Sequence, residues 1–261
     1  MWIDREKYIS HIKDTEKIIK MRQLLDKIQI VLNNHILETT DFLDPYERKL
    51  AVSILNRFPD INYLEYGGYN DAERKIIIIF PDYFAQDNIM KGVSIFRVDG
   101  SLDLMNHRDY LGALLNLGIV RDKIGDILVH DDFGFIMVME EISDYIQYNF
   151  EKVGNTKIKI KSVNEEDIII PKTEFKEVKR FLTSLRLDVI ISGAYNLSRK
   201  KSNSLVKAEN VKLNWETINK SYVELEPGDI VSVRGYGRFI LHNIEGKSKK
   251  GRLMCIIRIL I

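Results

Sequence analysis

The chain has 261 residues, enough for two or three domains, and its 45% hydrophobic and 30% charged residues are ordinary for a globular protein. A single cysteine, Cys255, excludes a disulfide framework and favours a reducing compartment. Since no run of about 18 apolar residues could span a bilayer, we expect a cytoplasmic protein without a membrane partner.

The net charge of +1 conceals an uneven distribution. Residues 172–261 carry 18 lysines and arginines against 9 acidic residues, a balance of +9. Residues 1–171 then hold 21 basic and 29 acidic residues, a balance of −8. Such a split indicates a C-terminal third that meets a polyanion, although a solvated basic face without a partner gives the same count.

The N-terminal part is predicted to be helical over residues 1–70. In residues 17–36 apolar side chains recur at spacings of three and four, which is typical of an amphipathic helix. A second helix is expected within residues 44–58, because Asp44 stands as a cap before a proline and Glu47 completes a capping box. Two glycines then interrupt the chain.

Beyond these glycines the pattern changes to short β-branched runs separated by two helical segments. From Gly92 onward the order is β-α-β-β-α-β, which predicts a ferredoxin-like domain over residues 71–165, as in RNA-recognition domains and many unrelated proteins. Residues 166–181, with Pro171 and clustered charges, are expected to be a linker. The elements are strands at 75–81 and 93–99, a helix at 107–118, strands at 122–130 and 133–140, a helix at 141–153, and a strand at 156–163.

The tripeptides HRD (107–109) and DFG (132–134) match two signatures of protein kinases. A kinase also needs a glycine-rich loop and an asparagine five residues beyond the HRD aspartate, where this chain has Leu114. We therefore interpret both matches as chance. None of the five histidines stands at metal-ligand spacing, so no metal, cofactor or catalytic residue is expected.

The C-terminal third carries an unusual helix start. Ser198 is placed to cap a helix, and Arg199, Lys200 and Lys201 occupy its first turn. Cations at this end oppose the helix dipole, which makes sense if an anion such as phosphate binds there. The alternative is a solvated turn whose side chains point away.

Residues 182–261 resemble the S-four RNA-binding module, named for ribosomal small-subunit protein four, with a C-terminal β extension. The resemblance rests on RLD at 186–188, SR at 198–199, VKLN at 211–214 and PGDIV at 227–231. Glu209 stands where that family has glycine, so Asn210 is expected to take the left-handed conformation. The RNA contacts that the resemblance implies, extended by two arginines of RGYGRF and a basic turn that could reach rRNA phosphates, are Arg186, Ser198, Arg199, Lys200, Lys201, Lys207, Lys212, Asn214, Arg234, Arg238, Lys247, Lys249, Lys250 and Arg252.

The segment RLDVIISG also resembles the RLDxxTSG motif of pseudouridine synthases, whose aspartate attacks the base. Those enzymes need a large catalytic domain around the motif, and only some 70 residues follow Asp188 here. We therefore expect Asp188 to fix the start of the first helix of the module. An RNA-modifying enzyme remains an alternative function.

Over nearly its full length the chain resembles the YlmH family, through DFLDPYERKLA, GGYNDAERK, HRDYLGALLNLGIVRDKIGDILV, MEEISDYI, RGYGRF and GKSKKGR, in this order. The resemblance implies an α+β protein with a helical N-terminal region, an RNA-recognition-like middle domain and an S-four module. It implies a bacterial, non-enzymatic RNA-binding protein that acts on the large ribosomal subunit and tRNA, in quality control or translation. We expect a monomer, with cell-division proteins as possible partners and a division role as a further alternative.

The sequence allows two roles for the predicted strand that contains residues 133–139. Phe133 and Phe135 share one face of the run FGFIMVM, as base-stacking rings do in RNA-recognition sheets. Two acidic residues precede them, however, and Met137 and Met139 make the same face continuously apolar. We therefore expect this face to be buried beneath the N-terminal helices.

Overall fold

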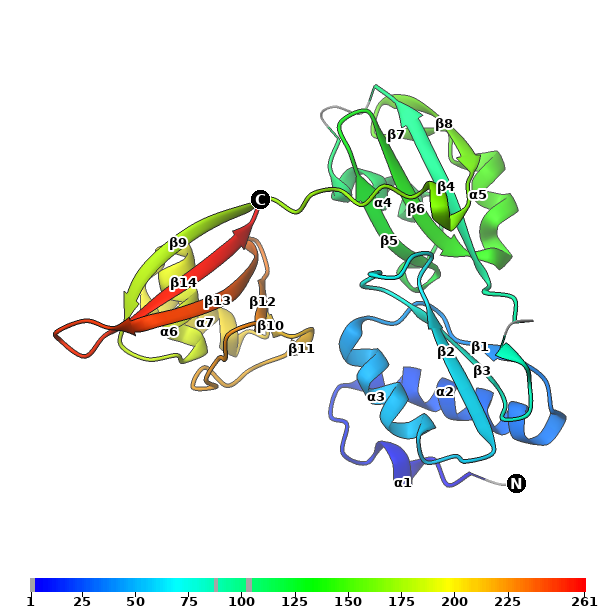
Figure 1. Cartoon of the computed structure of the whole chain (residues 1–261), viewed down its shortest axis with the longest axis horizontal. Helices are drawn as coiled ribbons and strands as arrows, with labels where there is room; N and C mark the ends of the chain where they lie inside the picture. The colour runs from blue at the N-terminus through cyan, green and yellow to red at the C-terminus, as the bar shows by residue number, and fades with distance from the viewer. Residues whose placement is uncertain (1–2, 87–88, 102–104) are drawn as a thin grey trace. The chain divides into compact units, whose positions relative to one another are not determined.

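The structure is a computed structural model that describes residues 3–86, 89–101 and 105–261. The chain divides into two compact units, Met1–Pro171 and Lys172–Ile261. Both combine helices with antiparallel sheets, so the predicted α+β class is confirmed (Figure 1). No helix in the described ranges is long and apolar enough to cross a membrane.

The first unit begins with three helices packed on a small sheet in the order β1-β3-β2. The predicted helix starts are present: Asp14 caps α2, and Asp44 and Glu47 form a capping box at α3. The elements are α1 (Glu6–Ile9), α2 (Thr15–Asn34), β1 (Glu38–Thr39), α3 (Pro45–Leu55), β2 (Ile61–Tyr66) and β3 (Ile76–Pro81).

Strand β3 corrects the expectation that the N-terminal part is only helical. It was assigned to the middle domain, but it pairs with both β1 and β2 and is the central strand of their sheet. All six of its residues are buried. Ile77 and Ile79 pack with the helices, whereas Ile76 and Ile78 face the middle domain, which explains the uninterrupted apolar run.

The second half of this unit has the predicted β-α-β-β-α-β order, with a two-residue strand added before the last strand. Its sheet order is β5-β6-β4-β8-β7. The HRD residues lie on a regular helix, where Asp109 closes a capping box with Asn106. The elements are β4 (Val93–Gly100), α4 (His107–Asn116), β5 (Ile124–Val129), β6 (Phe133–Met139), α5 (Ser143–Asn149), β7 (Lys152–Val153) and β8 (Thr156–Ser162).

The apolar face of β6 is buried, as predicted, but a sheet rather than the helices covers it. Phe135 is fully buried in a cluster with residues of β3 and with Phe42, which precedes α3. Phe42 reaches this position because residue 125 is glycine: a Cβ there would lie 2.6 Å from the phenylalanine ring. The helices α4 and α5 cover the opposite face of the β4–β8 sheet.

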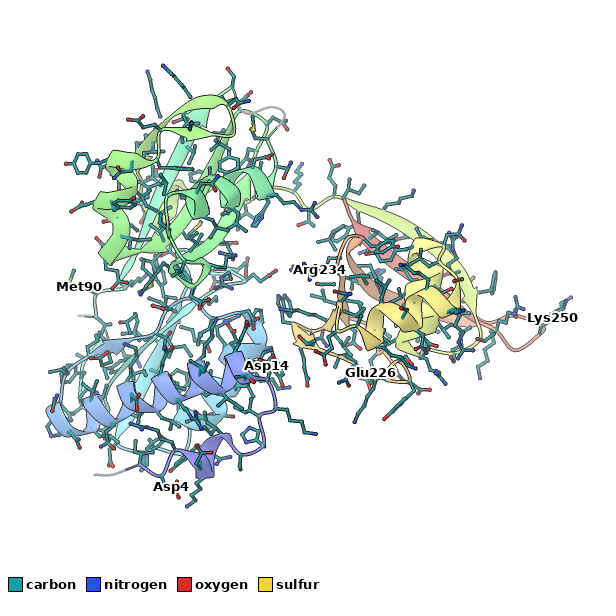
Figure 2. All side chains as sticks on the ribbon, turned by 180° about the vertical axis from the view of Figure 1, so that it is seen from behind. Asp4, Asp14, Met90, Glu226, Arg234 and Lys250 are labelled. Carbon is teal, nitrogen blue, oxygen red and sulfur yellow. The ribbon has the colours of Figure 1, made fainter. Side chains whose placement is uncertain are left out.

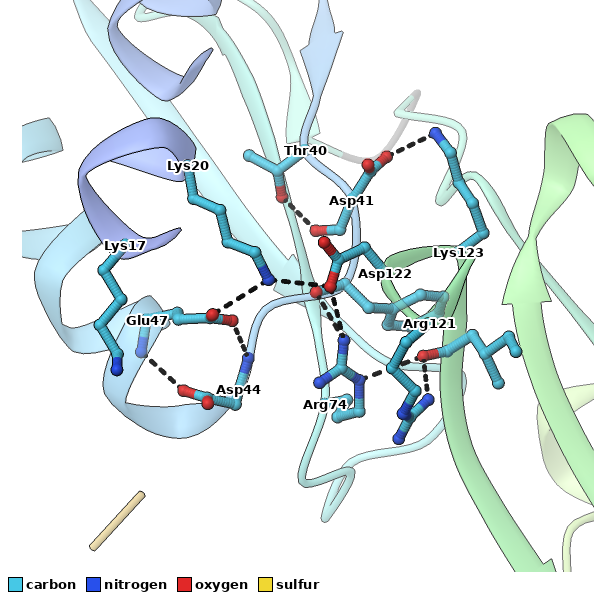
Figure 3. A network of polar contacts seen from close by, with 12 residues as sticks. Lys17, Lys20, Thr40, Asp41, Asp44, Glu47, Arg74, Arg121, Asp122 and Lys123 are labelled. Carbon is cyan, nitrogen blue, oxygen red and sulfur yellow. Dashed lines mark hydrogen bonds and ion pairs between the residues drawn. The ribbon is translucent and has the colours of Figure 1, made fainter. Parts of the chain in front are cut away.

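A polar network joins the two halves of this unit (Figure 3). The Lys20 ammonium lies 3.0 Å from Glu47 and 2.8 Å from Asp122, just before β5. Burial disfavours the charged form of Lys20, but the hydrogen bonds and charges of Asp122 and Glu47 together outweigh burial and raise the pKa of the lysine. Arg74 donates hydrogen bonds to the carbonyl oxygens of Phe42 (2.9 Å) and Ile124 (3.1 Å).

The second unit is a six-stranded antiparallel sheet, in the order β11-β10-β12-β13-β14-β9, with two helices packed on it. Cys255 lies in β14 with none of its surface exposed. The elements are β9 (Phe175–Leu182), α6 (Leu187–Tyr195), α7 (Arg199–Lys207), β10 (Val211–Leu213), β11 (Glu216–Thr217), β12 (Ile230–Val233), β13 (Gly237–Lys247) and β14 (Leu253–Leu260).

Strand β9 occupies much of the segment that was expected to be a linker. It pairs with β14 along its whole length, from Phe175 opposite Leu260 to Leu182 opposite Leu253. Only Val178 and Leu182 are buried in this strand, and they are four residues apart. The sequence therefore lacks the alternation that identifies a half-buried strand, and an expectation based on period two misses it.

Candidate nucleic-acid interface

The helix pair α6–α7 is set by a tight connection between its two helices. Asn196 ends α6 in the left-handed conformation (φ 54°), and its backbone N–H donates to the carbonyl of Ser192. Two residues later the Ser198 hydroxyl accepts a hydrogen bond from the Lys201 N–H at 3.2 Å, so the predicted cap of α7 is present. This connection brings the first turn of α7 close to the start of α6.

Asp188 of α6 connects the two helices through an ion pair with Arg199 of α7. Its carboxylate is only 1% exposed, and it accepts hydrogen bonds from Arg199 Nε at 2.9 Å and Arg186 Nε at 3.2 Å. The arginine side chains remain 59% and 35% exposed. The buried acid therefore holds two guanidinium groups side by side at the surface, each with donors left for another acceptor.

A groove of about 590 Å³ opens beside this cluster. Four of the predicted RNA contacts line it together, namely Arg186, Arg199, Lys200 and Lys207, with Asp188 as its acidic member. The first turn of α7 contains no acidic residue, and Asp188 is one negative charge against the four cations of the groove. The groove is thus an electropositive surface suited to phosphate.

Two further groove residues, Asn203 and Ser204, were missed by the sequence reasoning. They lie three to four positions after Arg199 and Lys200 and before Lys207, so one face of α7 presents all of them. Helical spacing from the basic first turn was the signal that would have found them. Asn203 also donates a hydrogen bond to the Ser221 hydroxyl at 3.1 Å.

The predicted contacts on and beside strands β10 and β13 do not line the groove. The Asn214 amide donates to Asp229 (2.8 Å) and accepts from the Ile230 N–H (3.0 Å), so it holds the β10–β11 turn against β12. Arg238 lies over the Trp215 ring at 5.4 Å. Lys212 is exposed on β10.

Glu209 itself takes the left-handed conformation (φ 57°), so the expectation for Asn210 is wrong. The residue that replaces the family's glycine also adopts the backbone conformation that glycine would supply.

The remaining basic residues are not gathered into one site with the groove. Lys250 lies at the tip of the turn between β13 and β14, whereas Arg234 lies at the opposite end of this unit (Figure 2). Lys247 ends β13, and Lys249 and Arg252 lie in the same exposed turn as Lys250. The structure therefore divides the predicted contacts into the groove with the start of α7, the residues on and beside strands β10 and β13, Arg234 between β12 and β13, and the β13–β14 turn.

The surroundings of Asp188 bear on the catalytic alternative. A nucleophilic carboxylate must reach its substrate, but both oxygens of Asp188 are engaged by arginines and the side chain is almost completely buried. This geometry favours a positioning role at the start of α6. Within the described ranges, no group of three or more histidine, cysteine or carboxylate side chains could hold a metal ion.

Comparisons with known proteins agree over most of the chain. Residues 16–84 match the family described as "YlmH, N-terminal", and residues 94–167 match "Putative RNA-binding domain in YlmH". The chain is 32% identical over 245 residues to the "Ribosome-associated protein quality control protein P2" of Bacillus subtilis (strain 168), covering 93% of this chain and 94% of that protein. A solved structure, "Cell division protein ylmH from Streptococcus pneumoniae", aligns with a TM-score of 0.52 and 21% identity over 60% of this chain and 97% of that one, a likeness of fold.

Proposed function

The chain belongs to the YlmH family, and from this premise we propose that it is a non-enzymatic RNA-binding factor of ribosome-associated quality control. Its target in this proposal is the large ribosomal subunit, through rRNA, tRNA or both. The observation that carries the proposal is the groove beside α7, which four cationic side chains line and in which a buried acid holds two of them. A ribosomal target places this work in the cytoplasm.

The proposed mechanism is electrostatic. Lysines and arginines that neutralise RNA phosphates release counterions, which supplies affinity that falls steeply with salt. The shape of a structured RNA then selects the site, because A-form helices present phosphates and 2′-hydroxyls rather than readable base edges. The Asp188 cluster contributes by holding Arg186 and Arg199 in fixed positions before RNA arrives.

In this proposal the second unit acts as an S-four module, and the groove residues carry most of the contact energy. We propose that the chain acts as a monomer. The other predicted contacts extend the surface and remain to be tested individually: Ser198, Lys201, Lys212, Asn214, Arg234, Arg238, Lys247, Lys249, Lys250 and Arg252.

The test reverses the two groove lysines, Lys200→Glu and Lys207→Glu, in the full chain. Both are exposed and neither forms an ion pair with a described residue, so the fold should persist. We expect co-sedimentation with purified ribosomes to be lost. Losing two phosphate contacts should also reduce the slope of log affinity against log salt by about 1.5.

The matched control is Lys172→Glu with Lys176→Glu, which makes the same charge change at exposed positions of the same unit outside the groove. It should bind ribosomes almost as the unaltered chain does. If the groove variant co-sediments as well as the control does, the proposed function is wrong.

A further inference from the structure

Strand β8 carries a row of lysines on one face of the middle-domain sheet. Its sequence, TKIKIKS, alternates exposed lysines with half-buried isoleucines that pack against the helices. Side chains two apart on a strand lie about 7 Å from each other on the same face. Lys157, Lys159 and Lys161 therefore form a line, and Lys152 on β7 lies directly opposite Lys157.

The register places this row on the same face as the two phenylalanines of β6. Lys161 pairs with Arg97 of β4, and Arg97 pairs in turn with Phe135. Lys159 pairs with Asp99, which pairs with Phe133. The face opposite the helices thus has an aromatic half on β6 and a cationic half on β8 and β7.

The aromatic half is closed to bases. Phe135 is fully buried against the N-terminal sheet. The Phe133 ring has the Arg97 guanidinium 3.9 Å from its centre and the His130 ring stacked at 4.4 Å. Two groups this close to the ring must occupy its two faces, so Phe133 stacks on the protein. Any RNA contact on this face must therefore come from charge.

The cationic half is concentrated in a unit that is acidic overall, with a balance of −8 over residues 1–171. Asp99 is the carboxylate that faces the row, and it is ion-paired with Arg97 at 2.7 Å. Lys152, Lys157, Lys159 and Lys161 are exposed and form no ion pair with the part of the chain that is described. Three lysines in line and a fourth beside them, none ion-paired with a described residue, complement a phosphate backbone.

We propose that the lysine row of Lys152, Lys157, Lys159 and Lys161 is a second RNA-binding surface, which holds the phosphate backbone of an RNA strand without reading bases. This inference rests on the proposed RNA-binding function and adds to the groove of the second unit. The competing explanation is that lysines protect an exposed sheet edge from pairing with other chains. Beyond Ile158 the outer side of β8 has no partner strand among the described residues, so the experiment must separate the two.

The experiment neutralises the row in the full chain, with Lys157→Gln, Lys159→Gln and Lys161→Gln. The control neutralises three exposed lysines of the same unit, Lys7, Lys13 and Lys49, to glutamine. Binding of a fluorescein-labelled 20-nucleotide oligouridylate is followed by anisotropy at several KCl concentrations. Each variant is made both with and without the groove reversals, and thermal melting confirms the fold.

We expect the row variant to bind the oligouridylate at least tenfold more weakly than the control, in both backgrounds. Three lost contacts to a single strand should lower the slope of log affinity against log salt by about 2. Row and control variants with equal affinity and slope would overturn the inference. So would a row variant that aggregates while its monomer, isolated by gel filtration, binds as the control does, because that result assigns the lysines to edge protection.

The two proposals fail separately. If the groove reversals abolish ribosome co-sedimentation and the row variant binds the oligouridylate like the control, the function stands and the row does not. If the groove reversals have no effect on co-sedimentation, the function itself is wrong.

Discussion

We expect that removing both arginines around Asp188 destabilises the second unit more than any substitution of its exposed lysines does. In the variant Arg186→Met with Arg199→Met, the Asp188 carboxylate keeps its burial, with 1% of its side chain exposed, and loses both hydrogen-bond partners. An uncompensated buried charge costs about 3–5 kcal/mol. Since a domain is stable by only about 5–15 kcal/mol, the loss should be large relative to the whole.

Removing the negative charge of Asp188 instead of the arginines should lower the stability only slightly. Asp188→Asn alone leaves two arginines that are 35% and 59% exposed, so water can solvate them in place of the carboxylate. We expect a cost of about 1–2 kcal/mol from the weaker hydrogen bonds. Added to the double arginine variant, Asp188→Asn should restore most of the lost stability, because no buried charge then remains.

Urea unfolding measures these free energies. The chain has two tryptophans, so a Trp2→Phe background makes fluorescence report only on Trp215 in the second unit. Lys172→Met with Lys176→Met is the control for loss of two cations. If the arginine variant is as stable as this control, or if Asp188→Asn fails to rescue it, the electrostatic account of the cluster is wrong.

Three further predictions concern packing and titration. The Tyr110 hydroxyl is buried without a hydrogen-bond partner among the described residues, and burial raises its pKa to about 12. As the pH rises, the unfolded chain loses this proton before the folded chain does, so the free energy of unfolding should fall between pH 10 and 12. The variant Tyr110→Phe should lack that part of the fall. At pH 7 it should be more stable by about 1 kcal/mol in urea titrations, because no unpaired hydroxyl is then buried. Burial raises the pKa of the Cys255 thiol, so the native chain should resist Ellman's reagent at pH 8 and react once unfolded; a fast native reaction would contradict its burial. Gly125→Ala should lower the melting temperature by displacing Phe42, at a cost of about 1–3 kcal/mol, whereas Gly112→Ala in α4, with open space around it, should raise it.

The parts of the fold that were predicted correctly depend on residues close together in sequence. Asp44 and Glu47 are three residues apart and specify a helix start by themselves, as does Ser198 with the N–H of Lys201. The position of β3 depends instead on pairing with β1 and β2, and nothing within its own residues encodes which sheet it joins. Its uninterrupted apolar run predicted a strand but not the two partners that bury its two faces.

In the candidate site, too, the residues that local patterns specify were predicted, and the role that depends on a long-range contact was not. Arg199 and Lys200 were identified from the basic first turn of a helix, and Lys207 followed from the resemblance to the S-four module. The role of Asp188 was only partly predicted, because its contact with Arg199 spans eleven residues and two helices. Its partner Arg186 lies two residues away, and that short spacing gave no sign of a shared carboxylate.

The sheet face that carries Phe133 shows what a single strand cannot reveal. The alternation in β6 identified which residues share a face, and Met137 showed that this face is apolar. The alternation in β8 is equally visible in the sequence. Only the register, which pairs Lys161 with Arg97 and Arg97 with Phe135 of β6, shows that its lysines lie on the same face as the phenylalanines. On this face the phenylalanines of β6 are packed against protein groups, whereas the lysines of β8 are exposed. The inference that charge rather than stacking would bind RNA here requires both strands and the pairing between them.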